Sequence, residues 1–110
     1  MSAFEVLGQR ISRDEFFVIG GPCVIESEES ALAAARFMAE ACRRLGIPYV
    51  YKSSYDKANR TSIESYRGPG IDRGLEILSR VRHEAGVPVL TDVHGAAEAV
   101  QAAEVVDILQ

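Results

Sequence analysis

The chain has 110 residues, of which 47% are hydrophobic and 25% are charged, a balance typical of a soluble globular domain rather than a disordered segment. Its net charge of −4 argues against a nucleic-acid-binding surface, and no apolar run approaches the roughly 20 residues that a membrane-spanning helix needs. Two cysteines without metal-finger spacing, and no basic leader before the first apolar run, lead us to expect a reduced, cytoplasmic protein.

The first part of the chain predicts a hairpin, a strand and a long helix. Residues 4–14 carry apolar residues on either side of a glycine, which predicts a short hairpin or an extended lead-in. The continuous apolar run 16–20 predicts a strand buried on both faces, and two glycines and a proline interrupt it. A helix is expected from the cap residue Ser27 to Gly46, with a buried stripe at helical spacing formed by Leu32, Ala35, Met38, Cys42 and Leu45.

The rest of the chain alternates strands with helices. Strand patterns cover residues 48–51, 87–92 and 105–110, and helical patterns cover residues 71–85 and 95–104. This alternation, with near-continuous apolar strands, indicates right-handed βαβ units around a parallel sheet. We therefore expect residues 1–110 to form a partial α/β domain with four parallel strands and three helices.

Residues able to carry chemistry follow the predicted strands, at the end where parallel α/β proteins bind their ligands. These are Cys23 after the first strand, residues 52–62 after the second, residues 92–94 after the third, and Gln110. The two lysines of the chain, Lys52 and Lys57, lie in the second group, and Arg60 and Arg67 follow them. This local positive excess in an acidic chain indicates an anion site within the unusually long connection 53–70.

Each of these residues also has an ordinary structural interpretation. Cys23 is either a small buried apolar side chain or a thiolate metal ligand, with His94 as a candidate partner. The lysine segment is either an anion site or a solvated loop. Asp92 either accepts hydrogen bonds from a substrate or caps a loop, whereas Cys42 is expected only to pack in the core and His83 to face solvent.

Four segments resemble the 3-deoxy-D-manno-octulosonate 8-phosphate synthase family in order and spacing. They are FFVIGGPCVIES, YKSSYDKANRTSIESYRGPG, VLTDVH and VVDILQ. The resemblance implies the N-terminal half of a TIM (β/α)₈ barrel, preceded by the short hairpin. It also implies an aldol-type condensation of phosphoenolpyruvate with D-arabinose 5-phosphate and water, which gives the octulosonate phosphate and inorganic phosphate for lipopolysaccharide precursors.

The same resemblance implies individual roles. Lys52 and Lys57 match lysines that contact phosphoenolpyruvate and the developing intermediate, and Asp92 matches an acidic residue near the sugar. Cys23 matches the cysteine that binds a divalent metal, zinc, iron or manganese, in the metal-dependent class. The expected catalytic residues are thus Lys52, Lys57 and Asp92, and the expected substrate-binding residues are Lys52, Ser54, Lys57, Asn59, Arg60 and Ser62.

The resemblance further implies a cytoplasmic homo-oligomer, a tetramer, without nucleic-acid or membrane partners. The family's other metal ligands and phosphate-binding residues lie beyond Gln110, so we expect the chain by itself to be inactive, and to aggregate, fold partly or pair with another copy. Two alternatives stay open. One is the 3-deoxy-D-arabino-heptulosonate 7-phosphate synthase, and the other is a truncated, non-catalytic phosphosugar-binding remnant of the same fold.

Overall fold

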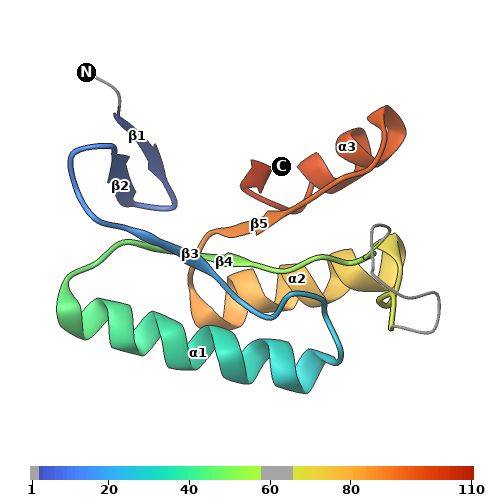
Figure 1. Ribbon diagram of the computed structural model, residues 1–110, viewed down its shortest axis with the longest axis horizontal. Helices are drawn as coiled ribbons and strands as arrows, with labels where there is room; N and C mark the ends of the chain where they lie inside the picture. The colour runs from blue at the N-terminus through green and yellow to red at the C-terminus, as the bar shows by residue number, and fades with distance from the viewer. Residues whose placement is uncertain (1–2, 58–65) are drawn as a thin grey trace.

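The computed structural model describes residues 3–57 and 66–110, and in them a small hairpin precedes a parallel sheet flanked by helices (Figure 1). The hairpin consists of β1 (Ala3–Val6) and β2 (Gln9–Ser12), which pair antiparallel. The sheet has the order β3-β4-β5-β6, and its strands are β3 (Val18–Gly20), β4 (Tyr49–Lys52), β5 (Val89–Thr91) and β6 (Ile108–Leu109). All three pairings in this sheet are parallel, as the strand–helix alternation predicts.

Three helices connect the parallel strands, and their ends lie where the sequence predicts them. They are α1 (Glu28–Leu45), α2 (Ile71–Ala85) and α3 (Ala96–Ala103). The Ser27 side chain caps α1 by accepting a hydrogen bond from the Ser30 amide at 3.0 Å. Gly46 ends the helix in the left-handed conformation, with φ of 70°. Among the described residues, no helix is long and apolar enough to cross a membrane.

The core lies between the sheet and the pair α1 and α2, which run side by side on one face of the sheet (Figure 1). Strand β4 is the centre of this layer, because Tyr49 and Tyr51 are both fully buried against the helices. Burial raises the pKa of both phenols. The Tyr49 hydroxyl donates to the Gly20 carbonyl at 2.8 Å, whereas the Tyr51 hydroxyl has no hydrogen-bond partner in the described structure.

Two predictions about burial are wrong. The apolar run 16–20 is not buried on both faces, because Phe16 is 74% exposed and Ile19 is 44% exposed. Val18 packs on the core, so Ile19 points to the opposite face of the sheet, and Phe16 precedes the strand itself. Leu45 is 71% exposed because it lies in the last turn of α1, where no described element covers it.

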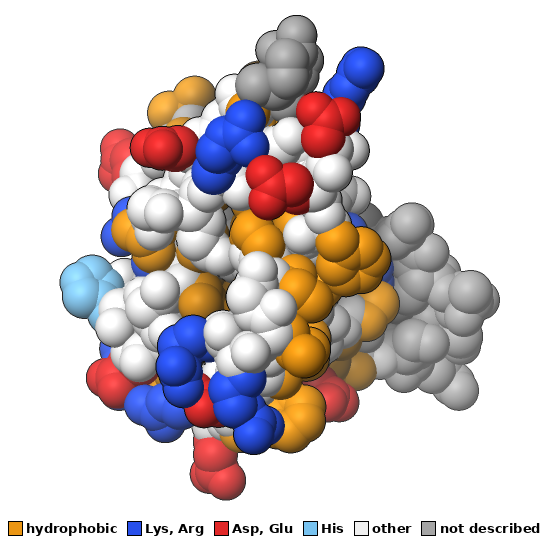
Figure 2. Space-filling view, turned by 90° about the vertical axis from the view of Figure 1, so that its left-hand side faces the viewer, with side chains coloured by type: hydrophobic (Ala, Val, Ile, Leu, Met, Phe, Trp, Pro, Cys, Tyr) orange, Lys and Arg blue, Asp and Glu red, His pale blue; other side chains and the backbone are white. Residues whose placement is uncertain are grey.

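The hairpin is fastened to the end of the sheet at which the parallel strands begin. The Gln9 side chain donates to the Tyr49 carbonyl at 2.8 Å and accepts from the Tyr49 amide at 2.6 Å. Figure 2 views this end of the molecule, where acidic and basic side chains are interspersed with apolar ones. No patch of a single charge dominates the described surface in that view.

Candidate functional site

A pocket of about 210 Å³ lies at the carboxyl ends of β3 and β4. It brings together the first two groups of residues that the sequence places after strands. The lining residues are Ile19, Gly20, Gly21, Pro22, Cys23, Lys52, Ser54 and Lys57. The prediction that Cys23, Lys52, Ser54 and Lys57 meet at one end of the sheet is therefore confirmed in the geometry.

The parallel pairing of β3 and β4 continues past the strands and shapes this pocket. Gly20 lies opposite Tyr51, and farther along the Ser54 amide donates to the Cys23 carbonyl at 3.2 Å. The Ser53 hydroxyl donates to the Pro22 carbonyl at 2.6 Å. Between these contacts the chain passes so close to β4 that a Cβ atom on Gly21 would lie 2.1 Å from the Lys52 carbonyl oxygen. The glycine is thus required for the two backbones to approach.

The electrostatics of the pocket rest on two lysines that lack acidic partners among the described residues. Each of the nine arginines in residues 3–57 and 66–110 has a carboxylate oxygen within 4.0 Å. Lys52 and Lys57 have none within that distance in the same ranges, and both are half-buried and line the pocket. Their positive charge is therefore available to an anionic ligand.

The predicted carboxylate, Asp92, lies just after β5 and is held by its neighbours. The Ser54 hydroxyl donates to Asp92 Oδ1 at 2.6 Å. His94 Nε2 lies 3.5 Å from Asp92 Oδ2 and 2.9 Å from the Asp56 carbonyl oxygen. Because a carbonyl oxygen can only accept, Nε2 carries a proton in this arrangement. Because the Ser54 hydroxyl hydrogen is engaged with Asp92, the Ser54 oxygen can take part in a further hydrogen bond only as an acceptor.

Tyr55 is a structural part of this site that the sequence interpretation missed. It is buried, its hydroxyl donates to the Glu98 carboxylate, and its ring makes an edge contact with His94 at 6.0 Å between centroids. Burial, followed by the hydrogen bond to Glu98, raises the pKa of Tyr55. Gly74, inside the helical pattern of α2, was the available signal: a Cβ there would lie 2.3 Å from the Tyr55 Cβ.

The sequence counts Arg67 among the cations available to an anion, and the structure corrects this. Its Nε lies 2.6 Å from Asp56 Oδ1, and its Nη2 lies 3.3 Å from Asp56 Oδ2. This hydrogen-bonded carboxylate raises the pKa of Arg67 and compensates its charge. The described part of the segment therefore offers Lys52 and Lys57 to an anion, but not Arg67.

Several predicted residues lie elsewhere. Asn59, Arg60 and Ser62 fall outside the described residues. Gln110 continues the sheet edge, since its amide donates to the Thr91 carbonyl at 3.0 Å and its carbonyl accepts from Val93 at 3.0 Å. Cys42 is buried in the core and His83 is exposed, as predicted.

The structure places Cys23, the predicted metal ligand, in the lining of the pocket. Cys23 is a free, exposed thiol at the mouth of the pocket, which suits a single metal ligand. Within the described ranges, however, no three His, Cys, Asp or Glu side chains come together as a metal site. A site of three or more such ligands would therefore need at least one side chain from outside those ranges.

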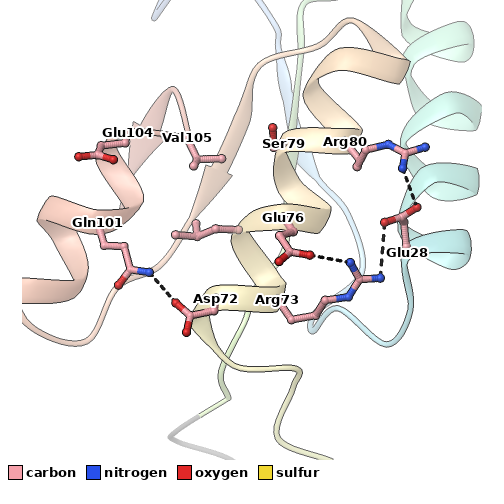
Figure 3. A pocket seen from close by; sticks show the side chains of 10 residues that line it. Glu28, Asp72, Arg73, Glu76, Ser79, Arg80, Gln101, Glu104 and Val105 are labelled. Carbon is pink, nitrogen blue, oxygen red and sulfur yellow. Dashed lines mark hydrogen bonds and ion pairs between the residues drawn. The ribbon is translucent and has the colours of Figure 1, made fainter.

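A larger cavity of about 660 Å³ lies between α2 and α3, and no predicted site residue lines it (Figure 3). Both arginines that line it are paired with carboxylates, and Asp72 accepts a hydrogen bond. Glu28 pairs with Arg73 at 3.5 Å and with Arg80 at 3.3 Å, and Gln101 donates to Asp72 at 2.8 Å. Size alone therefore does not make it the better candidate for an anion site.

Comparison with known proteins agrees with the segments that carry the resemblance. The sequence model of the DAHP synthetase I family matches residues 7–110. A 2-dehydro-3-deoxyphosphooctonate aldolase of Syntrophobacter fumaroxidans is 66% identical over 110 residues, which are 100% of this chain and 38% of that protein.

Proteins of the same name from two further organisms show a similar level of identity. The one from Acidithiobacillus ferrooxidans is 60% identical over 95 residues, and the one from Legionella pneumophila is 58% identical over 94 residues. In both comparisons the match covers 86% of this chain and 34% of the relative. The chain thus spans somewhat over a third of the length of the curated relatives that it matches.

Proposed function

Because this chain belongs to the DAHP synthetase I family, we propose that it forms part of a synthase that condenses phosphoenolpyruvate with D-arabinose 5-phosphate. The name that these relatives share, 2-dehydro-3-deoxyphosphooctonate aldolase, denotes an eight-carbon phosphorylated keto acid. Phosphoenolpyruvate supplies three carbons, so an eight-carbon product requires a five-carbon acceptor. The heptulosonate alternative would require a four-carbon acceptor.

The observation that carries this proposal is the pair of lysines, Lys52 and Lys57, without carboxylate partners in the described structure. Phosphoenolpyruvate carries a carboxylate and a phosphate, and a second phosphorylated substrate must approach it. Fixed cations in a partly buried pocket offset the mutual repulsion of such anions. Holding the two substrates together can also lower the barrier by ~7–11 kcal/mol relative to free encounter.

The proposed reaction forms one carbon–carbon bond and exchanges the C2–O bond to phosphate for a C2–O bond to the oxygen of water. C3 of phosphoenolpyruvate joins the aldehyde carbon of the sugar, and the aldehyde oxygen takes up a proton. Water adds at C2 and loses its two protons as the C2 ketone forms, and inorganic phosphate leaves with the C2–O bond electrons. Lys52 and Lys57 would bind phosphoenolpyruvate and the intermediate, and Asp92, held by Ser54, would face the sugar. Asn59, Arg60 and Ser62 are proposed to hold the sugar phosphate on the strength of the family resemblance.

We also propose that Cys23 is one ligand of a divalent metal, zinc, iron or manganese, in the complete site. A thiolate donor suits these ions better than magnesium. When bound, such an ion would supply a fixed positive charge near the reacting groups. The exposure of the Cys23 thiol at the mouth of the pocket supports this role.

We propose that the sheet and helices of this chain are part of a TIM barrel. The parallel sheet β3-β4-β5-β6, with α1 and α2 on one face, is an α/β arrangement of the kind that repeats around a TIM barrel. The exposure of Ile19 on the other face supports further elements packing there in a longer protein. A homo-tetrameric assembly and a cytoplasmic location are proposed from the family resemblance.

The test uses a protein of the relatives' full length that contains this chain, hereafter the full-length protein. Phosphate release is measured with phosphoenolpyruvate and either arabinose 5-phosphate or erythrose 4-phosphate. We expect the higher kcat/KM with the five-carbon sugar. The reverse preference would identify a heptulosonate synthase, and release with neither sugar would favour the non-catalytic alternative.

The lysine assignment is tested in the same assay with Lys52→Met and Lys57→Met, which remove the charge and keep the side-chain length. Losing a charge-assisted contact of ~1.5–3 kcal/mol should lower kcat/KM by roughly 10- to 100-fold. Arg36→Met is the matched control, because Arg36 is an exposed cation on α1 that pairs with Glu84 and does not line the pocket. Equal effects of all three substitutions would contradict the assignment.

A further inference from the structure

We propose that Arg67 is a positioning residue that holds Lys57 in the pocket, rather than a cation that binds substrate; this inference rests on the proposed role of Lys57. Arg67 contacts two consecutive residues in two different ways. Its guanidinium donates to the Asp56 carboxylate at 2.6 and 3.3 Å. Its backbone carbonyl accepts a hydrogen bond from the Lys57 amide at 2.6 Å.

The backbone around Arg67 is shaped for this contact. The next residue, Gly68, has φ of 123°, and a Cβ there would lie 2.3 Å from the Tyr55 carbonyl oxygen. Only glycine is compatible with both the conformation and the close approach. The two chain segments are joined again farther on, where the Gly70 amide donates to that same Tyr55 carbonyl at 3.1 Å. Arg67 thus lies in a segment that is held against residues 55–57.

Residues 55 and 56 are also attached to the connection between β5 and α3 and to α3 itself. His94 Nε2 donates to the Asp56 carbonyl at 2.9 Å, and the Tyr55 hydroxyl donates to Glu98. The Asp56 carbonyl thus accepts a hydrogen bond from His94, and the Asp56 carboxylate accepts hydrogen bonds from Arg67. Lys57, the next residue, owes its backbone position to this pair of attachments.

The charges argue against direct substrate binding by Arg67. Its guanidinium is engaged with a carboxylate in a two-point contact, whereas Lys57 has no carboxylate within 4.0 Å in the described ranges. Exposed ion pairs contribute little to the stability of a fold, and the Arg67 side chain is 55% exposed. A functional effect of removing it would therefore come from the position of Lys57. A displacement of ~1 Å in an active site can lower the rate by as much as 10²-fold.

The experiment compares Arg67→Gln, Asp56→Asn and the double variant in the full-length protein. Arg36→Gln is the matched control, because the Arg36 side chain is also 55% exposed and also pairs with one carboxylate, Glu84, at 2.9 Å. Steady-state kinetics give kcat and KM for phosphoenolpyruvate. Hydrogen exchange reports the protection of the Lys57 amide without relying on any catalytic activity.

We expect each single variant to lower kcat/KM by roughly tenfold or more. The double variant should be no worse than the worse single one, because both changes break the same contact. Arg67→Lys keeps the charge but loses the two-point geometry, and should recover only part of the activity. The Lys57 amide should exchange faster in Arg67→Gln than in Arg36→Gln.

Two results would overturn the inference. If Asp56→Asn tightened the binding of phosphoenolpyruvate, Arg67 would be a substrate cation that Asp56 restrains. If Arg67→Gln matched Arg36→Gln in kinetics and in Lys57 exchange, Arg67 would have no positioning role. A full-length wild type without synthase activity would instead contradict the proposed function, and the exchange measurement would still decide whether Arg67 holds Lys57.

Discussion

Replacing Gly21 by alanine is the sharpest perturbation of the pocket that the structure offers. The added Cβ would lie 2.1 Å from the Lys52 carbonyl oxygen, 3.1 Å from the Lys52 carbonyl carbon and 3.2 Å from a Tyr51 ring carbon. The closest of these distances is about 0.9 Å short of the 3.0 Å that real Cβ contacts respect. Since the obstacle is backbone on a central strand, no side-chain rotation relieves it.

The size of the effect follows from that displacement. Forcing extra volume into a packed site typically destabilises a protein by ~1–3 kcal/mol. The group displaced is the backbone of Lys52, whose side chain lines the pocket. A shift of ~1 Å at such a residue should lower kcat/KM by up to roughly 10²-fold. Gly21→Ala is therefore expected to lose both stability and activity.

The neighbouring glycine provides the control. A Cβ on Gly20 would meet nothing closer than the Val18 side chain at 3.8 Å, an ordinary contact. Gly20→Ala should be neutral, or should stabilise by ~0.4–1 kcal/mol through the unfolded chain. Urea unfolding and phosphate-release kinetics of both variants in the full-length protein make the comparison. Indistinguishable results for the two variants would refute the reasoning from close approach.

Three further predictions concern the hairpin, pH and the metal. Gln9→Ala should lower the free energy of unfolding, measured in urea, by ~1–3 kcal/mol, because it leaves the Tyr49 amide and carbonyl unpaired. The control Gln101→Ala, on the surface, should change it by no more than ~0.5 kcal/mol. Equal losses in the two variants would contradict the attachment of the hairpin through Gln9. The raised pKa of buried Tyr49 means that its contribution to stability is complete below its ordinary pKa of about 10 and is lost as the pH rises above that value, by ~1.4 kcal/mol per pH unit. Tyr49→Phe should flatten the decline in unfolding free energy measured above pH ~10. An unchanged slope of unfolding free energy against pH would contradict the assignment of this decline to Tyr49. Chelator treatment should remove bound metal and activity together. Cys23→Ser should lower the metal content found by elemental analysis. Full metal content and activity in Cys23→Ser would exclude the thiol as a ligand.

Local signals in the sequence determined the order and type of the elements. The hairpin, the Ser27 cap, the glycine that ends α1 and the alternation of strands and helices all act over a few residues, so they can be read without knowing the rest of the fold. The placement of Cys23, Lys52, Ser54 and Lys57 at one end of the sheet also followed, because parallel strands present their carboxyl ends together. The motif around Lys57 indicated the family from the sequence alone, because a motif depends on residue types and their spacing and not on the fold.

The tertiary structure decided what each side chain does once it reaches that end. Phe16 and Leu45 look like core residues in a local pattern, but they are exposed because no described element covers them. Arg67 counts as a free cation in the sequence, yet it pairs with Asp56, eleven positions away, and Ser54 donates to Asp92, thirty-eight positions away. The register between strands and the path of the loops determine such partners. Neither can be derived from composition or from periodicity. Charge compensation and hydrogen-bond partners at the site are therefore known only once distant segments are packed together.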